Sequence, residues 1–465
     1  MGKSQSFFNS AIFYTLGVAF GLGAQFLLTT VLYGQWLDDV NFGLTQLYYT
    51  WFSVFGVIVG LEAANSLNNA RIHYGEDKLG GYSSSLIGIG LVTLGVYAAV
   101  LAIFQGFFVP AMSFSLPILL SALVQGFFWF CCVLIAQKCR VTKQPIQFVL
   151  WSVLAYLLRL VLCVIIVPRM GADAYIGDII GSVIGYSIAG VIALVFLLRD
   201  GRTIFNKAYW KYCLVLTVPI VFHSLSNIVL GQADRVMLNG MSGAGEMGVY
   251  SFAYNIGAIA NAVWIAFNNA WTVWYYDKTK EGKDGEILDL YKKYVWFVSL
   301  LSFAIILIAP DLVSFFAKDE ALASGAPLTP VIMLGCFFMF LYSFPVAYET
   351  YRGKTVYIAI GTISAAVCNI VLNLVFIPVW GAMGAAITTL ISYAALFFFH
   401  YIIARFIVKG FQINLARLLL PAAFAACVMA LTYATMDIVW VRWVLAAASV
   451  LVSLFVYKRS MHIKL

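Results

Sequence analysis

The chain has 465 residues, of which 63% are hydrophobic and only 10% are charged. Soluble globular proteins contain about a quarter charged residues, so this composition excludes a soluble fold of this size. The net charge of +8 would favour nucleic acid as a partner of a soluble protein, but here the basic residues lie in short loops between apolar stretches. Membrane orientation and contact with anionic headgroups explain them, so we expect membrane lipids and no nucleic acid among the partners.

Fourteen apolar stretches follow one another along the chain, and most have the roughly 20 residues needed to cross a bilayer core. The first is too long for the apolar region of a signal peptide, so we expect it to be retained. The sequence therefore predicts an all-α polytopic membrane protein with fourteen transmembrane helices. We place the spans at about 7–33, 42–68, 84–107, 115–137, 146–168, 175–198, 212–233, 247–275, 294–316, 328–350, 355–378, 382–404, 418–435 and 438–457.

Positive charge is concentrated in alternate gaps between these spans. With Met1 placed inside, 23 of the 28 Lys and Arg residues fall in cytoplasmic segments, four at the outer side (Arg169, Arg235, Lys318 and Arg442, the last at the outer end of its span), and one, Arg159, in the middle of a span. This distribution follows the positive-inside rule. It predicts that both termini are cytoplasmic and that the protein is a multi-pass component of the cytoplasmic membrane.

The chain contains a weak internal repeat. Leu160–Ala172 aligns with Ile370–Ala382 at an offset of 210, with the Pro and Gly of one outer turn in register. A second match, at an offset of 205, pairs Gly43 and Tyr49 with Gly248 and Tyr254. Spans one to six then correspond to spans seven to twelve in the same orientation, and such parallel repeats place a substrate path between two lobes.

The repeat predicts three parts of the chain. Residues 1–198 form an N-lobe of six spans, residues 199–410 form a C-lobe of six spans, and residues 411–465 add two C-terminal helices without a counterpart.

Two segments carry a family resemblance. The first runs from Pro219 to Leu238, includes the pair Asp234-Arg235, and is followed by Gly248-Val-Tyr250. The second comprises Asn369-Ile-Val-Leu-Asn373, Ile377-Pro378, Gly381 and Gly384-Ala-Ala-Ile-Thr-Thr389. Both resemble the polysaccharide flippases of the multidrug/oligosaccharidyl-lipid/polysaccharide exporter superfamily. With the fourteen spans and the repeat, the resemblance covers nearly the whole chain.

The resemblance implies that the protein flips an undecaprenyl-diphosphate-linked oligosaccharide across the membrane by alternating access, for surface polysaccharide assembly, with a polysaccharide polymerase as a further partner. The alternative within the superfamily is a cation-coupled multidrug exporter, which would favour an acidic cavity over a cationic one. A membrane enzyme of polysaccharide assembly is a third hypothesis. It would need a large catalytic loop, whereas the longest gap between spans is under twenty residues.

Known chemical motifs are absent from the sequence. We find no Walker A loop, HExxH, GxSxG or Cys/His ligand cluster, so we expect no catalytic residues, no metal and no cofactor. Transport would then be driven by an H⁺ or Na⁺ gradient, by the membrane potential, or by consumption of the lipid-linked sugar outside.

Arg159 is the strongest candidate for substrate binding. A lipid-facing charge at mid-span costs at least ~2.5 to 3.5 kcal/mol, so Arg159 should face a partner or a wet cavity. A guanidinium suits a diphosphate, while a structural ion pair is the competing interpretation. Glu62 is a candidate partner or coupling-cation ligand, or else a solvated helix-end carboxylate. Glu349 lies one turn from Arg352, and we interpret those two residues as an interfacial pair.

Polar residues of the second half supply the remaining candidates. His223 could take part in proton coupling, although a histidine bonded between helices is more common. Asn227, Asn255 and Asn369 could bind sugar hydroxyls, or could hold helices together. Asp234 and Arg235, at the outer mouth of their span, are interpreted as a gating or turn-fixing pair rather than as a substrate contact.

Overall fold

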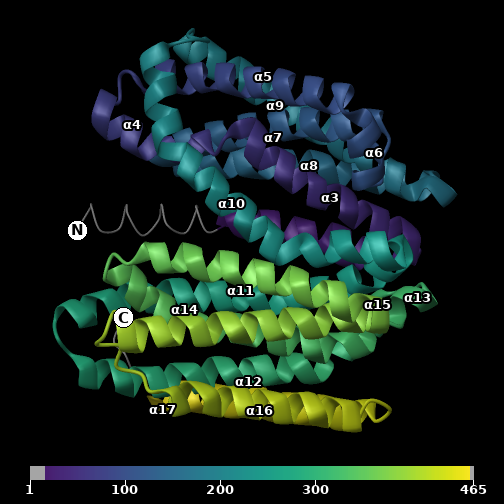
Figure 1. The fold of residues 1–465 in the computed structure, drawn as a ribbon, viewed down its shortest axis with the longest axis vertical. Coiled ribbons are helices and arrows are strands. Elements are labelled where there is room, and N and C mark those ends of the chain that lie inside the picture. The colour runs from purple at the N-terminus through teal and green to yellow at the C-terminus, as the bar shows by residue number, and fades with distance from the viewer. Residues whose placement is uncertain (1–15, 461–465) are drawn as a thin grey trace. The chain divides into compact units, whose positions relative to one another are not determined.

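The computed structural model describes residues 16–460, and within that range every regular element is a helix (Figure 1). The chain divides into two compact units. Unit 1 consists of two segments, the residues before Asp38 and Leu44–Ile228. Unit 2 consists of the short segment Asp38–Gly43 and of Val229–Leu465. Two long helices, α3 and α10, therefore contribute residues to both units.

Unit 1 is built from the helices of the first half of the chain. They are the first candidate span Leu16–Trp36, which includes a π-helical turn at Leu27–Leu32 and α2 at Tyr33–Trp36, then α3 Asp39–Gly60, α4 Leu67–Tyr74, α5 Leu79–Ile103, α6 Gln105–Met112, α7 Leu116–Val141, α8 Pro145–Ile166, α9 Ala174–Gly201 and the first part of α10 Lys207–Ser242. Within this unit α9 packs against α7 and α8. Short 3₁₀ turns occur at Ala63–Ser66, Val167–Arg169 and Gly171–Asp173.

Unit 2 is built from the helices of the second half. They are α11 Ala244–Lys280, α12 Asp284–Phe316, α13 Glu320–Ala323, a 3₁₀ turn Ala326–Leu328, α14 Thr329–Tyr351, α15 Thr355–Ile402, a π-helical turn Ile403–Ile407, α16 Leu415–Ala434 and α17 Val439–Ser460. Here α14 packs against α15, and both α16 and α17 pack against α12 (Figure 1).

The membrane-spanning helices agree broadly with the sequence prediction. Twelve helical stretches among the described residues are long and apolar enough to cross a membrane. One of them, Thr355–Ile407, contains two predicted spans, which are separated by the non-helical backbone of Gly381. The predicted span at 247–275 corresponds to α11, which is not among the twelve. The all-helical membrane class is confirmed, and the count of fourteen stays a prediction.

Glycines occupy the turn that the sequence predicts to be external in each half of the repeat. Gly171 and Gly381 have φ of +56° and +51°, in the left-handed region that glycine adopts most readily. The backbone N–H of Ala382 then donates to Oε1 of Glu246 at 2.7 Å. A Cβ at Gly381 would lie 1.9 Å from the same oxygen, so this turn also needs a residue without a side chain. The two turns share a positive φ at the glycine, but Gly171 begins a 3₁₀ turn whereas Gly381 has a ψ of −131°, so their equivalence stays a prediction.

A buried ion pair attaches the last helix to unit 2. Arg442 on α17 donates to both carboxylate oxygens of Asp311 on α12 and to the carbonyl oxygens of Thr435 and Met436. Its side chain is only 2% exposed. A buried guanidinium is stable when all of its nitrogen donors are paired, as they are here. We therefore interpret Arg442 as a structural residue that attaches α17 to α12.

The orientation of the termini is a prediction that labelling can test. Residues 7–15 of the first predicted span lie outside the described residues. The predicted orientation rests on the distribution of Lys and Arg along the sequence. Single cysteines should react only from the cytoplasm at Lys78, Lys143, Lys207 and Lys283. They should react from the exterior at Asp39, Gly171, Gly243 and Lys318. The check is labelling by a membrane-impermeant maleimide in whole cells and in inverted vesicles. External labelling at Lys207 would contradict the two six-span lobes.

Candidate functional site

A glycine stripe on α9 brings the polar groups of unit 1 together. Gly181 and Gly185 lie one helical turn apart and face α8. A Cβ at Gly185 would lie 2.7 Å from the backbone nitrogen of Arg159, and one at Gly181 would lie 3.1 Å from that of Cys163. Small residues at such an interface allow two membrane helices to approach closely. The side chains next to the stripe on α9 are therefore pressed against Arg159.

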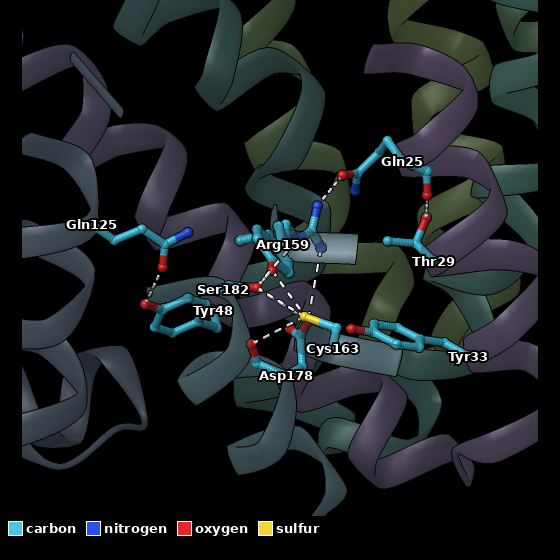
Figure 2. A network of polar contacts seen from close by, with 10 residues as sticks. Gln25, Thr29, Tyr33, Tyr48, Gln125, Arg159, Cys163, Asp178 and Ser182 are labelled. Atoms are coloured by element: carbon cyan, nitrogen blue, oxygen red, sulfur yellow. Dashed lines mark hydrogen bonds and ion pairs between the residues drawn. The ribbon is translucent and has the colours of Figure 1, made fainter. Parts of the chain in front are cut away.

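Arg159 lies at the centre of this polar cluster (Figure 2). Its Nε donates to Oγ of Ser182 at 3.1 Å, and its Nη1 donates to Oε1 of Gln25. Its Nη2 lies 3.8 Å from Oδ1 of Asp178, and the guanidinium stacks over the ring of Tyr49 at 4.4 Å. The side chain is only 2% exposed. Arg159 is thus held in an ion pair inside unit 1, with Nη2 making no hydrogen bond.

Asp178 provides the compensating charge. Its Oδ1 accepts from the hydroxyl of Tyr33, and it also lies 3.2 Å from the hydroxyl of Tyr49 and 3.3 Å from Oγ of Ser182. Its Oδ2 has no hydrogen-bond partner and the side chain is fully buried. One oxygen of the carboxylate and one nitrogen of the guanidinium are therefore available for other partners.

A second polar cluster lies in unit 2. Asp234 on α10 is 3% exposed, accepts from the hydroxyl of Tyr250 and lies 3.4 Å from Oγ1 of Thr389. The guanidinium of the adjacent Arg235 stacks over the ring of Tyr254 at 5.3 Å. Asp234 therefore lies inside α10 against α11 and α15, and Arg235 reaches α11 rather than fixing a turn.

The same cluster extends along α15 on both sides of Gly381. The side chain of Asn373 makes two hydrogen bonds: its amide donates to Oδ1 of Asn369 at 3.0 Å, and its Oδ1 accepts from the hydroxyl of Thr388. All three side chains are buried. Asn369 and Asn373 therefore hold the two halves of α15 together in this conformation.

The two clusters occupy corresponding positions of the repeat. At the offset of 210, Arg159 corresponds to Asn369 and Cys163 to Asn373 on one helix, while Asp178 corresponds to Thr388 on the next. The Sγ of Cys163 lies 3.5 Å from Asp178, as Asn373 lies against Thr388. Corresponding residues therefore make corresponding contacts, and among the positions compared here only Arg159 and Asp178 are charged.

Other sequence-predicted residues lie elsewhere. His223 and Asn227 are exposed on α10, where Nε2 of His223 lies 3.1 Å from Nδ2 of Asn227. Asn255 is half-buried on α11. Glu62 follows the end of α3, has a φ of +54° and accepts from Asn65 at 2.7 Å. Glu62 is therefore not the carboxylate that pairs with Arg159.

The interpretation of Glu349 as an interfacial partner of Arg352 is wrong. Glu349 is fully buried on α14, and both of its oxygens lie 3.0 Å from Nδ1 of His400 on α15. Arg352 is exposed and donates to the hydroxyl of Tyr348 at 3.2 Å. The helical spacing placed Glu349 correctly, but its partner lies on another helix.

Sequence reasoning missed Asp178 and Gln25. Asp178 is the one carboxylate within the predicted span 175–198, so the rule that intramembrane charges need partners could have found it. Gln25 has no such signal, because uncharged amides are common in spans.

Comparison with known families assigns the chain. A family model described as polysaccharide biosynthesis protein matches residues 7–275, which is more than half of the chain. The chain belongs to this family. A second model, MatE, matches residues 219–375. An uncharacterized membrane protein of Haemophilus influenzae is 22% identical over 414 residues, covering 83% of this chain and 92% of the relative.

Solved structures show which fold the chain has. The lipid II flippase MurJ in an inward closed conformation superposes with a TM-score of 0.70 at 14% identity, covering 97% of this chain and 99% of that one. An inward-facing multidrug resistance MATE family transporter gives 0.63 at 13% identity, covering 90% and 96%. A transporter from Pyrococcus furiosus gives 0.59 at 14% identity, covering 87% and 96%. The chain therefore shares the fold of these three structures, two of which are described as transporters of the MOP superfamily.

Proposed function

We propose that this protein flips a polyprenyl-diphosphate-linked oligosaccharide from the inner to the outer leaflet by alternating access between its two halves. The observation that carries the proposal is Arg159, a guanidinium buried at mid-span and paired with a single carboxylate, Asp178. A fixed positive charge at this depth suits a cargo with two phosphates. The match to the polysaccharide biosynthesis family supports the same substrate class.

The ion pair suggests how the positive charge of Arg159 is stabilised before the cargo binds. While no cargo is bound, Asp178 neutralises Arg159 and so lowers the cost of a charge within the membrane. A diphosphate is a stronger acceptor than the distant Asp178 oxygen, and it would bind the guanidinium through two parallel hydrogen bonds. Nη2 of Arg159 already has no hydrogen bond to give up. In this mechanism the cargo replaces Asp178 as the partner of Arg159 in one transport state.

Polar residues of unit 2 would have a different task. Asp234 is buried among the hydroxyls of Tyr250 and Thr389, so its protonation or the binding of a cation there would change the contact between α10 and α15. We propose that H⁺ or Na⁺ coupling, where it operates, uses Asp234, with Arg235 positioning α10 against α11. Sugar hydroxyls would bind to the accessible amides of Asn227 and Asn255 rather than to the buried Asn369.

A cation-coupled multidrug exporter is the second candidate function, because residues 219–375 match the MatE model. Reconstituted full-length protein separates the two hypotheses. We expect movement of a fluorescent polyprenyl-diphosphate oligosaccharide across proteoliposomes, and no accumulation of an organic dye cation driven by a pH or Na⁺ gradient. Dye transport without movement of the lipid-linked sugar would overturn the flippase proposal and establish the exporter.

A further inference from the structure

Unit 1 contains a large cavity that the proposed transport mechanism does not use. Its volume is about 1110 Å³, and it lies between the ends of α5, α7, α8 and α9 that the positive-inside pattern assigns to the cytoplasm. All of its lining residues belong to unit 1. The cavity is larger than an ordinary water-filled gap and has the size of a ligand site.

One part of the lining is charged, with both signs present. Lys78 and Lys138 contribute two ammonium groups, while Glu76, Asp77 and Asp200 contribute three carboxylates. Lys138 forms an ion pair with Asp200, and the two side chains are 17% and 52% exposed, so both can be reached by a ligand. An anion alone would meet three carboxylates here, and a cation alone would meet two ammonium groups. A ligand with one charge of each sign fits both sets.

Other residues of the lining are apolar. They include Leu150 and Phe196, which are 63% and 54% exposed, together with Trp151 and Leu154. Leu150, Trp151 and Leu154 belong to α8, which begins at Pro145. They lie five to nine residues after its start, which is roughly 8 to 14 Å along the helix axis. This wall therefore reaches from the interface into the hydrocarbon of the inner leaflet. The cavity is amphipathic, with its charged end at the membrane surface.

We propose that this cavity binds a zwitterionic phospholipid with a primary-amine headgroup. The phosphate lies at Lys138, the ammonium lies at Asp200, and an acyl chain runs along Trp151 and Phe196. A primary ammonium donates three hydrogen bonds, whereas a quaternary ammonium donates none. The carboxylates that line the cavity therefore select the primary amine. The proposed ligand is a lipid bound beside the transport path and is not the cargo.

Native mass spectrometry of the full-length protein tests the headgroup preference. Phosphatidylethanolamine, phosphatidylcholine and phosphatidylglycerol with identical acyl chains are added singly to delipidated protein. We expect phosphatidylethanolamine to be retained about tenfold more than the other two, as expected for one or two charge-assisted hydrogen bonds. Equal retention of the three lipids would overturn the proposal, as would preference for phosphatidylglycerol.

Two variants locate the lipid in the cavity. Lys138→Gln and Asp200→Asn should each lower retention of phosphatidylethanolamine by about tenfold. The matched control is Lys293→Gln, which removes one partner of the 2.8 Å pair Lys293–Asp289 on α12 and does not line the cavity. Unchanged retention in Lys138→Gln, or an equal loss in the control, would place the lipid elsewhere.

A spectroscopic readout keeps the charged residues of the cavity unchanged. Brominated phosphatidylethanolamine should quench Trp151 more strongly than brominated phosphatidylcholine, measured as the difference between the natural protein and Trp151→Phe. The control Trp296 is half-buried on α12 and does not line the cavity, so both lipids should quench it equally. Displacement of the brominated lipid by the lipid-linked oligosaccharide alone would assign the cavity to the cargo and overturn the proposal.

Discussion

Replacing Arg159 with Ala is expected to abolish transport of the lipid-linked oligosaccharide. The variant removes the one charge of the unit 1 cluster that can bind a diphosphate, and it leaves Asp178 buried without its partner. Removing one member of a buried pair costs about 3 to 5 kcal/mol, so part of the loss could arise from instability. Complementation of a polysaccharide-deficient strain, with the amount of membrane-inserted protein measured in parallel, gives the first readout.

A double variant separates the two causes. In Arg159→Ala with Asp178→Asn both charges are gone, and replacing both members of a buried pair is often close to neutral for stability. We expect protein abundance and thermal stability to return toward those of the natural protein, while transport stays absent. Recovery of transport by the double variant would show that Arg159 serves only to neutralise Asp178 and does not bind the cargo.

The second buried arginine offers a matched control. Arg442 is as deeply buried as Arg159 and is paired with Asp311, but that pair attaches α17 to α12. Arg442→Ala with Asp311→Asn should therefore retain transport in proportion to the amount of folded protein. Loss of transport in the Arg442 double variant at normal abundance would contradict a special role for Arg159.

Arg159→Lys should keep part of the transport activity, because it preserves the charge but loses the planar pair of donors.

The fold was largely accessible from sequence because hydropathy and positive charge act locally along the chain. Each apolar stretch needs about 20 residues to cross the bilayer, and its flanking lysines and arginines set its direction. The break at Gly381 was visible as a Pro-Gly turn in both halves of the repeat. Close packing of α8 on α9 was not predicted, because the glycine stripe at Gly181 and Gly185 signals small size without naming its neighbour.

Individual site residues were predictable only where the membrane penalises them. Arg159 was identified because an unpaired charge at mid-span is costly. Its true partner, Asp178, lies 19 residues further along the sequence and across a turn, so spacing rules for a single helix could not supply it. Glu349 was assigned to Arg352 by the i, i+3 rule. That rule describes neighbours on one helix surface, and it fails for a side chain that faces another helix.

Replacing His400 with Leu is expected to destabilise the protein strongly. Glu349 and His400 are both fully buried between α14 and α15, and each oxygen of the carboxylate lies 3.0 Å from Nδ1 of the imidazole. Without His400 the carboxylate has no partner, and we expect a loss of about 3 kcal/mol. That is well above the ~0.6 kcal/mol average of interhelical hydrogen bonds in membranes. Unfolding by denaturant in detergent micelles measures the difference.

The double-mutant cycle and a surface control decide what the pair contributes. In Glu349→Leu with His400→Leu neither polar group remains, so most of the stability should return and the coupling energy should exceed 1 kcal/mol. Arg352→Ala removes the neighbour that helical spacing had suggested, and since Arg352 is exposed the cost should stay below about 1 kcal/mol. A larger loss in Arg352→Ala than in His400→Leu would mean that Glu349 is stabilised from its own helix after all. The expected order of the three variants follows from burial, because the cost of an unpaired carboxylate grows as water is excluded from it.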